Sequence, residues 1–302
     1  MATAAQPTRA SLPLPGGRDG ATVRIYPLLG AECTSPRAWL LREEGRLARL
    51  RALGIGVSKE DLLTMPLVSF LLVHPGAGPV LVDTGMHPSV AVDPKQNFGR
   101  LASLAFRDIV MDPSQATPAQ LRALGIEPSE VRAVLMTHLH ADHASAASEL
   151  PEATFLVSAA EWRAATAPRA ALHGYVRSQF DHAFDYRTLD FDGPGADSFA
   201  TFGQAVDVFG DGSVRAVYTP GHTHGHMSIV ARLRSREVLI AADAIYMTRT
   251  LTHGHLPAHC EDEHRFRRSL REIQHYREQT PDALVIPGHD IEAWRALEPV
   301  YE

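Results

Sequence analysis

The sequence has few cysteines and no long apolar run. Its only two cysteines, Cys33 and Cys260, lie too far apart for a Cys-based metal motif or a short disulfide loop. No stretch approaches the roughly eighteen apolar residues that a membrane helix needs. Proline and glycine interrupt the first twenty residues before an apolar signal region can form. These absences predict a cytoplasmic protein with no membrane partner.

A block of basic charge is also missing. The chain has 29 Lys and Arg against 35 Asp and Glu, a net charge of -6, and no long run of either sign. Nucleic-acid binding needs a positive surface that follows the phosphates, so nucleic acid is not an expected partner. With 45% hydrophobic residues and no Pro/Gly/Ser-rich linker, the 302 residues are typical of a globular chain. We expect a flexible segment over residues 1–22 and one domain over 23–302.

Strand and helix signals alternate along the chain. Residues 22–29 predict a strand, and residues 67–85 predict two strands around a Pro/Gly turn. A helix is expected from Thr117 to Gly125, and a strand at Ala133–Met136. Strand-rich segments recur over 205–244, followed by an amphipathic helix over 261–278 and a strand within 282–290. This order predicts an α+β fold, an αββα sandwich of two mixed β-sheets packed face to face with helices outside.

Histidine is over-represented, with 16 residues, and three of them fall within six positions after the strand that ends near Met136. His138 and His140 alternate in a loop and can chelate one cation, while Asp142 and His143 can reach another. A lone histidine in such a loop is usually structural. Four ligand-type side chains in six residues favour a metal site instead.

A dinuclear site needs about three protein groups per metal, so further ligands should follow other strands. His222, Asp243 and His289 each come directly after a predicted strand. A carboxylate between two metals can bridge them, and divalent cations such as Zn accept this mixture of nitrogen and oxygen ligands.

Together, the segment 138–143 (HLHADH), His222, Asp243 and His289 resemble the HxHxDH…H…D…H pattern of the metallo-β-lactamase superfamily, over roughly residues 23–292. The segments 80–88, 219–228, 242–246 and 287–292 further resemble the N-acyl-homoserine lactone lactonases. The resemblance implies His138, His140 and His222 at one metal, Asp142, His143 and His289 at the other, and Asp243 between them. It also implies that Asp83 orients a metal-binding histidine, although an Asp-Thr-Gly turn is common without that role.

The resemblance implies a dinuclear metal-dependent lactonase that opens a small-molecule lactone with a metal-bridging hydroxide. Two metal ions sharing a water lower the pKa of that water toward neutrality. Tyr246, three residues after Asp243, would stabilise the oxyanion, and Asp142 would carry the proton to the leaving oxygen. Zinc is the expected metal, with Fe, Co and Mn as alternatives.

Other functions remain open at this stage. A thioesterase resembling glyoxalase II, or a hydrolase of another lactone or ester, would use the same ligands, whereas a non-enzymatic metal scaffold would not need Tyr246. Ser145 and Ala146 replace the usual glycines of the lactonases, and Ala141 replaces a larger apolar residue, so the acyl-chain preference is open.

Two further segments carry expectations of their own. Residues 41–66 are expected to form a helix or an ordered flap. Leu47, Leu50 and Leu53 of this segment would pack either on the body of the domain or against a partner. We also predict a homodimer in which the second copy helps to wall the pocket. The segment 253–264 holds four histidines, which we expect in a substrate-facing loop rather than in a third metal site. His224 is expected in solvent and His226 in a structural role.

Overall fold

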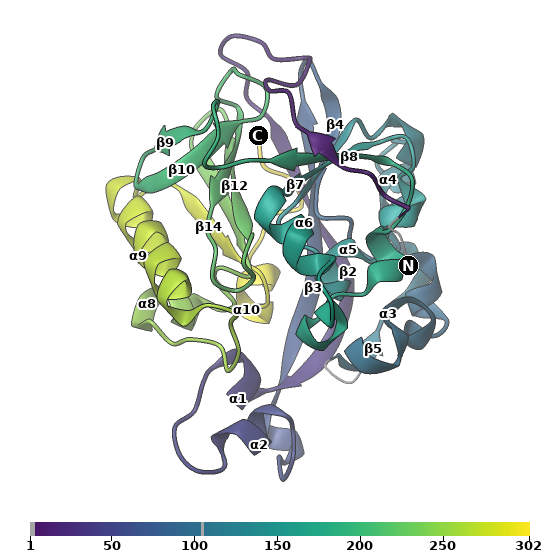
Figure 1. Cartoon of the computed structure of the whole chain (residues 1–302), viewed down its shortest axis with the longest axis vertical. Coiled ribbons are helices and arrows are strands. Elements are labelled where there is room, and N and C mark those ends of the chain that lie inside the picture. The colour runs from purple at the N-terminus through teal and green to yellow at the C-terminus, as the bar shows by residue number, and fades with distance from the viewer. Residues whose placement is uncertain (1–3, 104–105) are drawn as a thin grey trace.

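The computed structural model describes residues 4–103 and 106–302, and Figure 1 shows their arrangement. The strands of the first sheet are β1 (Thr8–Arg9), β2 (Arg24–Pro36), β3 (Leu62–His74), β4 (Gly78–Val82), β5 (Arg107–Val110), β6 (Ala133–Met136), β7 (Thr154–Ser158) and β8 (Asp185–Leu189). Those of the second sheet are β9 (Asp197–Phe199), β10 (Phe202–Asp207), β11 (Val214–Tyr218), β12 (Met227–Arg232), β13 (Glu237–Ala242) and β14 (Leu284–Pro287). The α-helices are α1 (Arg37–Leu40), α2 (Ala48–Ala52), α3 (Pro94–Ala102), α4 (Thr117–Ala123), α5 (Ala141–Ala144), α6 (Ala159–Ala165), α7 (Arg177–Phe180), α8 (Thr248–His253), α9 (Glu263–Gln279) and α10 (Ile291–Arg295).

Both sheets are mixed. The strand order is β1-β8-β7-β6-β4-β3-β2-β5 in the first sheet and β14-β13-β12-β11-β10-β9 in the second. In the first sheet β3 and β4 are antiparallel and β4 and β6 are parallel; in the second, β12 and β13 are antiparallel and β13 and β14 are parallel. Helices lie outside the two sheets (Figure 1). The predicted αββα sandwich is confirmed.

Alternation along the strands divides the core into layers. In β12, Met227 and Ile229 point into the layer between the sheets, whereas Val230 points outward. Successive side chains of a strand leave opposite faces, so each strand serves two cores. The outward side chains of the second sheet pack against α9 through Phe266 and Ile273. A third apolar layer covers the outer face of the first sheet and includes residues of α4, α5, α6 and α7.

Strand direction places the candidate ligands at one edge of each sheet. Strands β4 and β6 are parallel neighbours, so Asp83 and His138, which follow them, lie at the same edge. In the second sheet β12 is antiparallel to both β11 and β13, and β14 is parallel to β13. The carboxyl ends of β11, β13 and β14 therefore coincide, and His222, Asp243 and His289 follow them.

The N-terminal segment packs along the domain instead of standing apart from it. Residues 1–22 are expected to be flexible; residues 1–3 lie outside the described residues, and the rest makes defined contacts. Strand β1 pairs in parallel with β8, Ala5 is fully buried, and the Leu14 N–H donates to the Val208 carbonyl at 2.7 Å. Strand β1 thus extends the edge of the first sheet, and Leu14 joins the segment to the chain after β10 of the second sheet.

Residues 41–66 contain one short α-helix, α2, and a 3-10 turn over Lys59–Asp61 that leads into β3. Figure 1 shows α2 projecting from the body of the molecule. Leu47, Leu50 and Leu53 are 62%, 43% and 60% exposed, so the prediction that they pack on the body is wrong.

Within residues 4–103 and 106–302, no helix is both long and apolar enough to cross a membrane.

Candidate metal centre

The structure brings all seven predicted metal ligands together in two adjoining groups. His138, His140, His222 and Asp243 form the first group, and Asp142, His143 and His289 form the second. In each group one potential ligand atom per residue lies within 4.8 Å of all the others. The ligands come from the loop after β6, from α5, and from the loops after β11, β13 and β14, so both sheets contribute.

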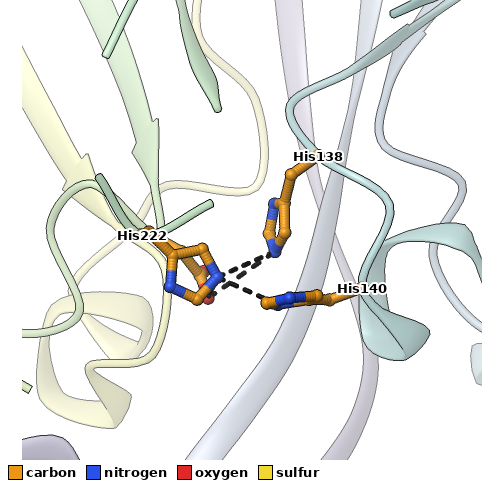
Figure 2. A group of neighbouring side chains, drawn as sticks. His138, His140 and His222 are labelled. Atoms are coloured by element: carbon orange, nitrogen blue, oxygen red, sulfur yellow. Dashed lines mark hydrogen bonds and ion pairs between the residues drawn. The ribbon is translucent and has the colours of Figure 1, made fainter. Parts of the chain in front are cut away.

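The first group centres on Nε2 of His222. This atom lies 3.2 Å from Nε2 of His138 and 3.0 Å from Nδ1 of His140. Figure 2 shows the three rings pointing toward one another from two chain segments. Oδ2 of Asp243 lies 3.2 Å from Nε2 of His222. Three imidazoles and one carboxylate oxygen therefore face a common point.

The second group lies on the other side of Asp243. Oδ2 of Asp142 is 3.4 Å from Nε2 of His143 and 3.6 Å from Nε2 of His289. Oδ1 of Asp243 is 3.4 Å from Nε2 of His143 and 3.1 Å from Nε2 of His289. One oxygen of Asp243 thus faces each group, which is the arrangement that a bridging carboxylate requires.

The residues present fit a pair of divalent cations. Nε2 of His143 and Oδ1 of Asp243 are buried and lack a hydrogen-bond partner within the described residues, and buried polar atoms are normally satisfied. A side chain at Gly288 would bring a Cβ within 2.8 Å of Oδ1 of Asp243, so glycine keeps the space beside that oxygen free. Neutral imidazole and carboxylate are ligands that zinc and similar cations accept.

The rings of His143 and His289 are each held from their far side. Nδ1 of His143 lies 2.7 Å from Oδ2 of Asp83, and Nδ1 of His289 lies 3.1 Å from the Pro66 carbonyl oxygen. Such partners fix the orientation and tautomer of a metal-binding ring. The structure therefore favours the orienting role of Asp83 over a simple turn.

The comparisons with known proteins agree with this geometry. The sequence profile of the Metallo-beta-lactamase superfamily matches residues 65–289. This chain belongs to the metallo-β-lactamase superfamily. The resemblance found in the HxHxDH segment and its companion ligands is thereby confirmed.

Several relatives of this superfamily member are lactonases. The chain is 34% identical to the N-acyl homoserine lactonase AttM of Rhizobium radiobacter over 76% of its own length and 84% of that protein's. It is 35% identical to AttM of Agrobacterium fabrum, with the same coverage. The fold is shared with a solved structure of a B. thuringiensis AiiA variant that has N-decanoyl-L-homoserine bound at its active site. The two structures superpose with a TM-score of 0.72 at 21% sequence identity, and the match covers 92% of this chain and 97% of that one. This superfamily member is a metal-dependent hydrolase related to the N-acyl-homoserine lactonases.

Burial dominates the pKa of the three histidines of the first group, whereas the neighbouring carboxylates outweigh burial and raise the pKa of His143 and of His289. Burial lowers the pKa of His138 and His222 well below the usual range and that of His140 to about 4. Burial alone would raise the pKa of Asp243, but His289, His222 and His143 outweigh it and hold that pKa well below its usual value. Neutral rings and an ionised carboxylate are the forms that bind a metal.

Tyr246 lies beside the ligands, where the resemblance to the lactonases places it. Its side chain is buried, and its hydroxyl is 3.1 Å from Nδ1 of His222. The ring belongs to an apolar cluster that includes Leu41, Met86 and Ala141.

A single helical turn, α5, carries the last two residues of the HxHxDH motif. Asp142 and His143 lie within this turn, which ends after four residues. Ser145 is buried; it donates to Oδ1 of Asn97 and accepts from the His87 N–H. Its hydroxyl therefore ties neighbouring loops together.

Two other histidines near the centre behave as expected. His226 is fully buried; Nδ1 lies 2.9 Å from the Thr219 hydroxyl, and Nε2 accepts from the Asp243 N–H. It thus supports the backbone that presents Asp243. The His224 side chain is 54% exposed.

Sequence reasoning missed Glu161, a fully buried carboxylate on α6. Oε1 accepts from the Leu139 N–H at 3.0 Å, and Oε2 accepts from the Thr223 hydroxyl at 2.6 Å and from the Gly225 N–H at 3.2 Å. It joins the loop of His138 and His140 to the loop of His222. Its position in the first turn after β7 was a weak signal, because its partners lie far away in sequence.

Proposed function

We propose that the chain opens the lactone ring of N-acyl-homoserine lactones, with two zinc ions held by the seven clustered residues. The observation that carries the proposal is the position of the Tyr246 hydroxyl, 3.1 Å from His222 at the edge of the ligand set. A metal-binding scaffold would have no need of a phenol there. Similarity to the AttM lactonases over most of the chain supports the substrate class.

The ligand assignment follows the two groups. His138, His140 and His222 would hold one ion, and Asp142, His143 and His289 the other, with one oxygen of Asp243 for each. When bound, the two ions would supply a water of lowered pKa and polarise the lactone carbonyl. Zinc fits the nitrogen-rich donor set, and Fe, Co or Mn would fit the same geometry.

The reaction adds one water across the ring ester. Its oxygen bonds to the carbonyl carbon, and the bond from that carbon to the ring oxygen breaks. Asp142 is a carboxylate at neutral pH, since His143 and His289 lower its pKa against the opposing effect of burial. It can take a proton from the attacking water and deliver it to the leaving alkoxide. The product is an N-acyl homoserine.

Tyr246 would stabilise the negative charge that develops on the carbonyl oxygen. Burial, with Asp243 and Asp142 nearby, raises the pKa of this phenol well above its usual value, so it keeps its proton. A neutral hydroxyl can donate to an oxyanion without reorganising during the reaction.

An apolar cluster of side chains lies beside Tyr246. Leu40, Leu41, Met65, Met86 and Phe98 are buried in the same cluster as the phenol ring. We infer that the acyl chain lies against these side chains while the lactone faces the ligands. Contact with apolar side chains would favour longer chains through the area removed from water.

The test is a substrate panel for the purified zinc-loaded protein. It contains short- and long-chain homoserine lactones, γ-lactones, a β-lactam and a glutathione thioester, each followed by proton release. The expected result is fast opening of the homoserine lactones, lost in Asp142→Asn. Turnover of only another ester or thioester would overturn the substrate proposal and keep the metal centre.

A homodimer is also part of the proposal. Leu47, Leu50, Leu53 and Ile55 are exposed on the projecting segment around α2, and a second copy of the same patch would cover them. Isologous contacts of this kind form the commonest oligomers. Sedimentation at micromolar concentration should give a dimeric mass that Leu50→Glu reduces to the monomer. A monomeric parent protein would contradict it.

A further inference from the structure

A further group of side chains of the types that bind metals lies outside the seven-residue centre. Nδ1 of His173 is 2.7 Å from Oε1 of Glu261, and Nε2 of His259 is 3.1 Å from the same oxygen. Nε2 of His224 lies 3.9 Å from Oε2. These three histidines surround one carboxylate, although they come from segments up to 86 residues apart (259 - 173).

The carboxylate of this group is largely buried, whereas two of its histidine rings are exposed to solvent. The side chain of Glu261 is 12% exposed, whereas those of His173 and His259 are 47% and 55% exposed. Ligand atoms of these three residues lie within 4.8 Å of one another. A cation bound there would have three protein ligands and a side open to water, which zinc readily accepts.

The group is attached to the backbone of the dinuclear centre. The Glu261 N–H donates to the His222 carbonyl oxygen at 3.2 Å. On the other side, His173 precedes Gly174, where a side chain would bring a Cβ within 3.0 Å of the His140 ring. The group therefore contacts the chain next to two ligands of the first metal position.

The geometry points to a third divalent-cation site, formed by His173, His259 and Glu261 with His224 beside them. The expected ligand is Zn²⁺ or a similar borderline cation, because the donors are two or three imidazoles and one carboxylate. Its affinity is weaker than that of the buried centre, since two of its rings are solvent-exposed. Occupation would join the segments 170–174 and 256–261 across the loop of His222.

The site is tested by metal stoichiometry on untagged full-length protein. After loading with zinc, the protein is dialysed against buffers of increasing free Zn²⁺, and zinc per chain is measured by mass spectrometry. We expect two equivalents at low free zinc and a third in the micromolar range. Glu261→Gln and His259→Ala should lose the third equivalent and keep the first two. The control is His253→Ala, at an exposed histidine on α8, which should keep all three.

A second measurement does not depend on variants. Titration of the zinc-loaded protein beyond two equivalents should shift the ring resonances of His173 and His259 in histidine NMR spectra, and leave those of His253 and His275 in place. Binding that stops at two equivalents, or a third equivalent that survives both Glu261→Gln and His259→Ala, would overturn the site. Uniform shifts of all exposed histidines would show adventitious binding and would also overturn it. Neither result bears on the lactonase assay.

Discussion

Asp83 and His143 form a carboxylate–imidazole pair, with Oδ2 2.7 Å from Nδ1, at the edge of the first sheet. Asp83 also accepts from the N–H and the hydroxyl of Thr137, at 2.7 and 2.8 Å. Its φ of 59° is unusual for a residue other than glycine, and such strain gathers at functional sites. Through this pair β4, which has no ligand of its own, orients a ring whose Nε2 faces both Asp142 and Asp243.

The first prediction concerns Asp83→Asn. The amide no longer provides two acceptor oxygens, so His143 loses its fixed tautomer and orientation. We expect the affinity for the second metal to fall about 10- to 100-fold, as is typical when such a partner of a ligand is removed. Competition with a chromophoric chelator measures the affinity. Asp282→Asn, an exposed site, is the control, and an unchanged affinity in Asp83→Asn would contradict the orienting role.

Tyr246→Phe tests the phenol. Removing an oxyanion donor typically costs on the order of a hundredfold or more in kcat. Because the hydroxyl is not assigned as a metal ligand, zinc content should stay at two equivalents. Steady-state kinetics on a homoserine lactone, with metal analysis of the same sample, checks both. A variant with full kcat would remove Tyr246 from the mechanism, and loss of zinc would reassign it as a structural support.

Glu161→Gln should destabilise the fold. The glutamine amide has one acceptor oxygen where the carboxylate has two. The N–H groups of Leu139 and Gly225 and the hydroxyl of Thr223 donate to both of those oxygens, so at least one of these donors loses its acceptor. Leaving buried donors unsatisfied costs about 1–3 kcal/mol each, so we expect the free energy of unfolding to fall by about that amount or more. Urea unfolding measures it, with exposed Glu60→Gln as the control. Equal stability of the two variants would show that Glu161 is not needed to hold the loops.

Asp211 should make the fold sensitive to acid. Although burial opposes ionisation, hydrogen bonds from Ser213, the Arg18 N–H and His74 lower its pKa from 3.8 to about 2. A lowered folded-state pKa contributes stability above pH 3.8 that is lost as the pH falls toward 2. Asp211→Asn should therefore be less stable by about 2 kcal/mol at pH 7, with the difference from the parent shrinking between about pH 4 and pH 2. Unfolding curves over this range check it; a pH-independent difference would contradict the assignment.

The ligand-bearing loops could be predicted from the sequence because they are local. HxHxDH is one short segment, and His222, Asp243 and His289 each follow a strand of recognisable composition. Asp83 was ambiguous until its contact with His143 was known, since a lone Asp-Thr-Gly turn has several uses. The strand-rich sheets were predictable because short apolar runs bounded by turn residues are typical of strands that are buried on both faces.

Long-range contacts explain most of what could not be predicted. The groups that donate to Glu161 lie far from it in sequence, and so do His173 and His259, which share one carboxylate; no sequence period relates these segments. His259 was expected in a substrate-facing loop rather than in a metal site, yet its Nε2 lies 3.1 Å from Oε1 of Glu261. The leucines around α2 have helical spacing, but the helix projects from the body, and spacing alone does not identify the surface that covers a helix.

The most direct test of the central claim is lactone hydrolysis as a function of zinc added to metal-free protein. If the seven residues hold two ions that act together with Asp142 and Tyr246, opening of an N-acyl-homoserine lactone should rise from background to a plateau at two equivalents. The same titration of Asp142→Asn should remain near background. Activity that is full without metal, or absent at two equivalents in a folded protein, would contradict the account.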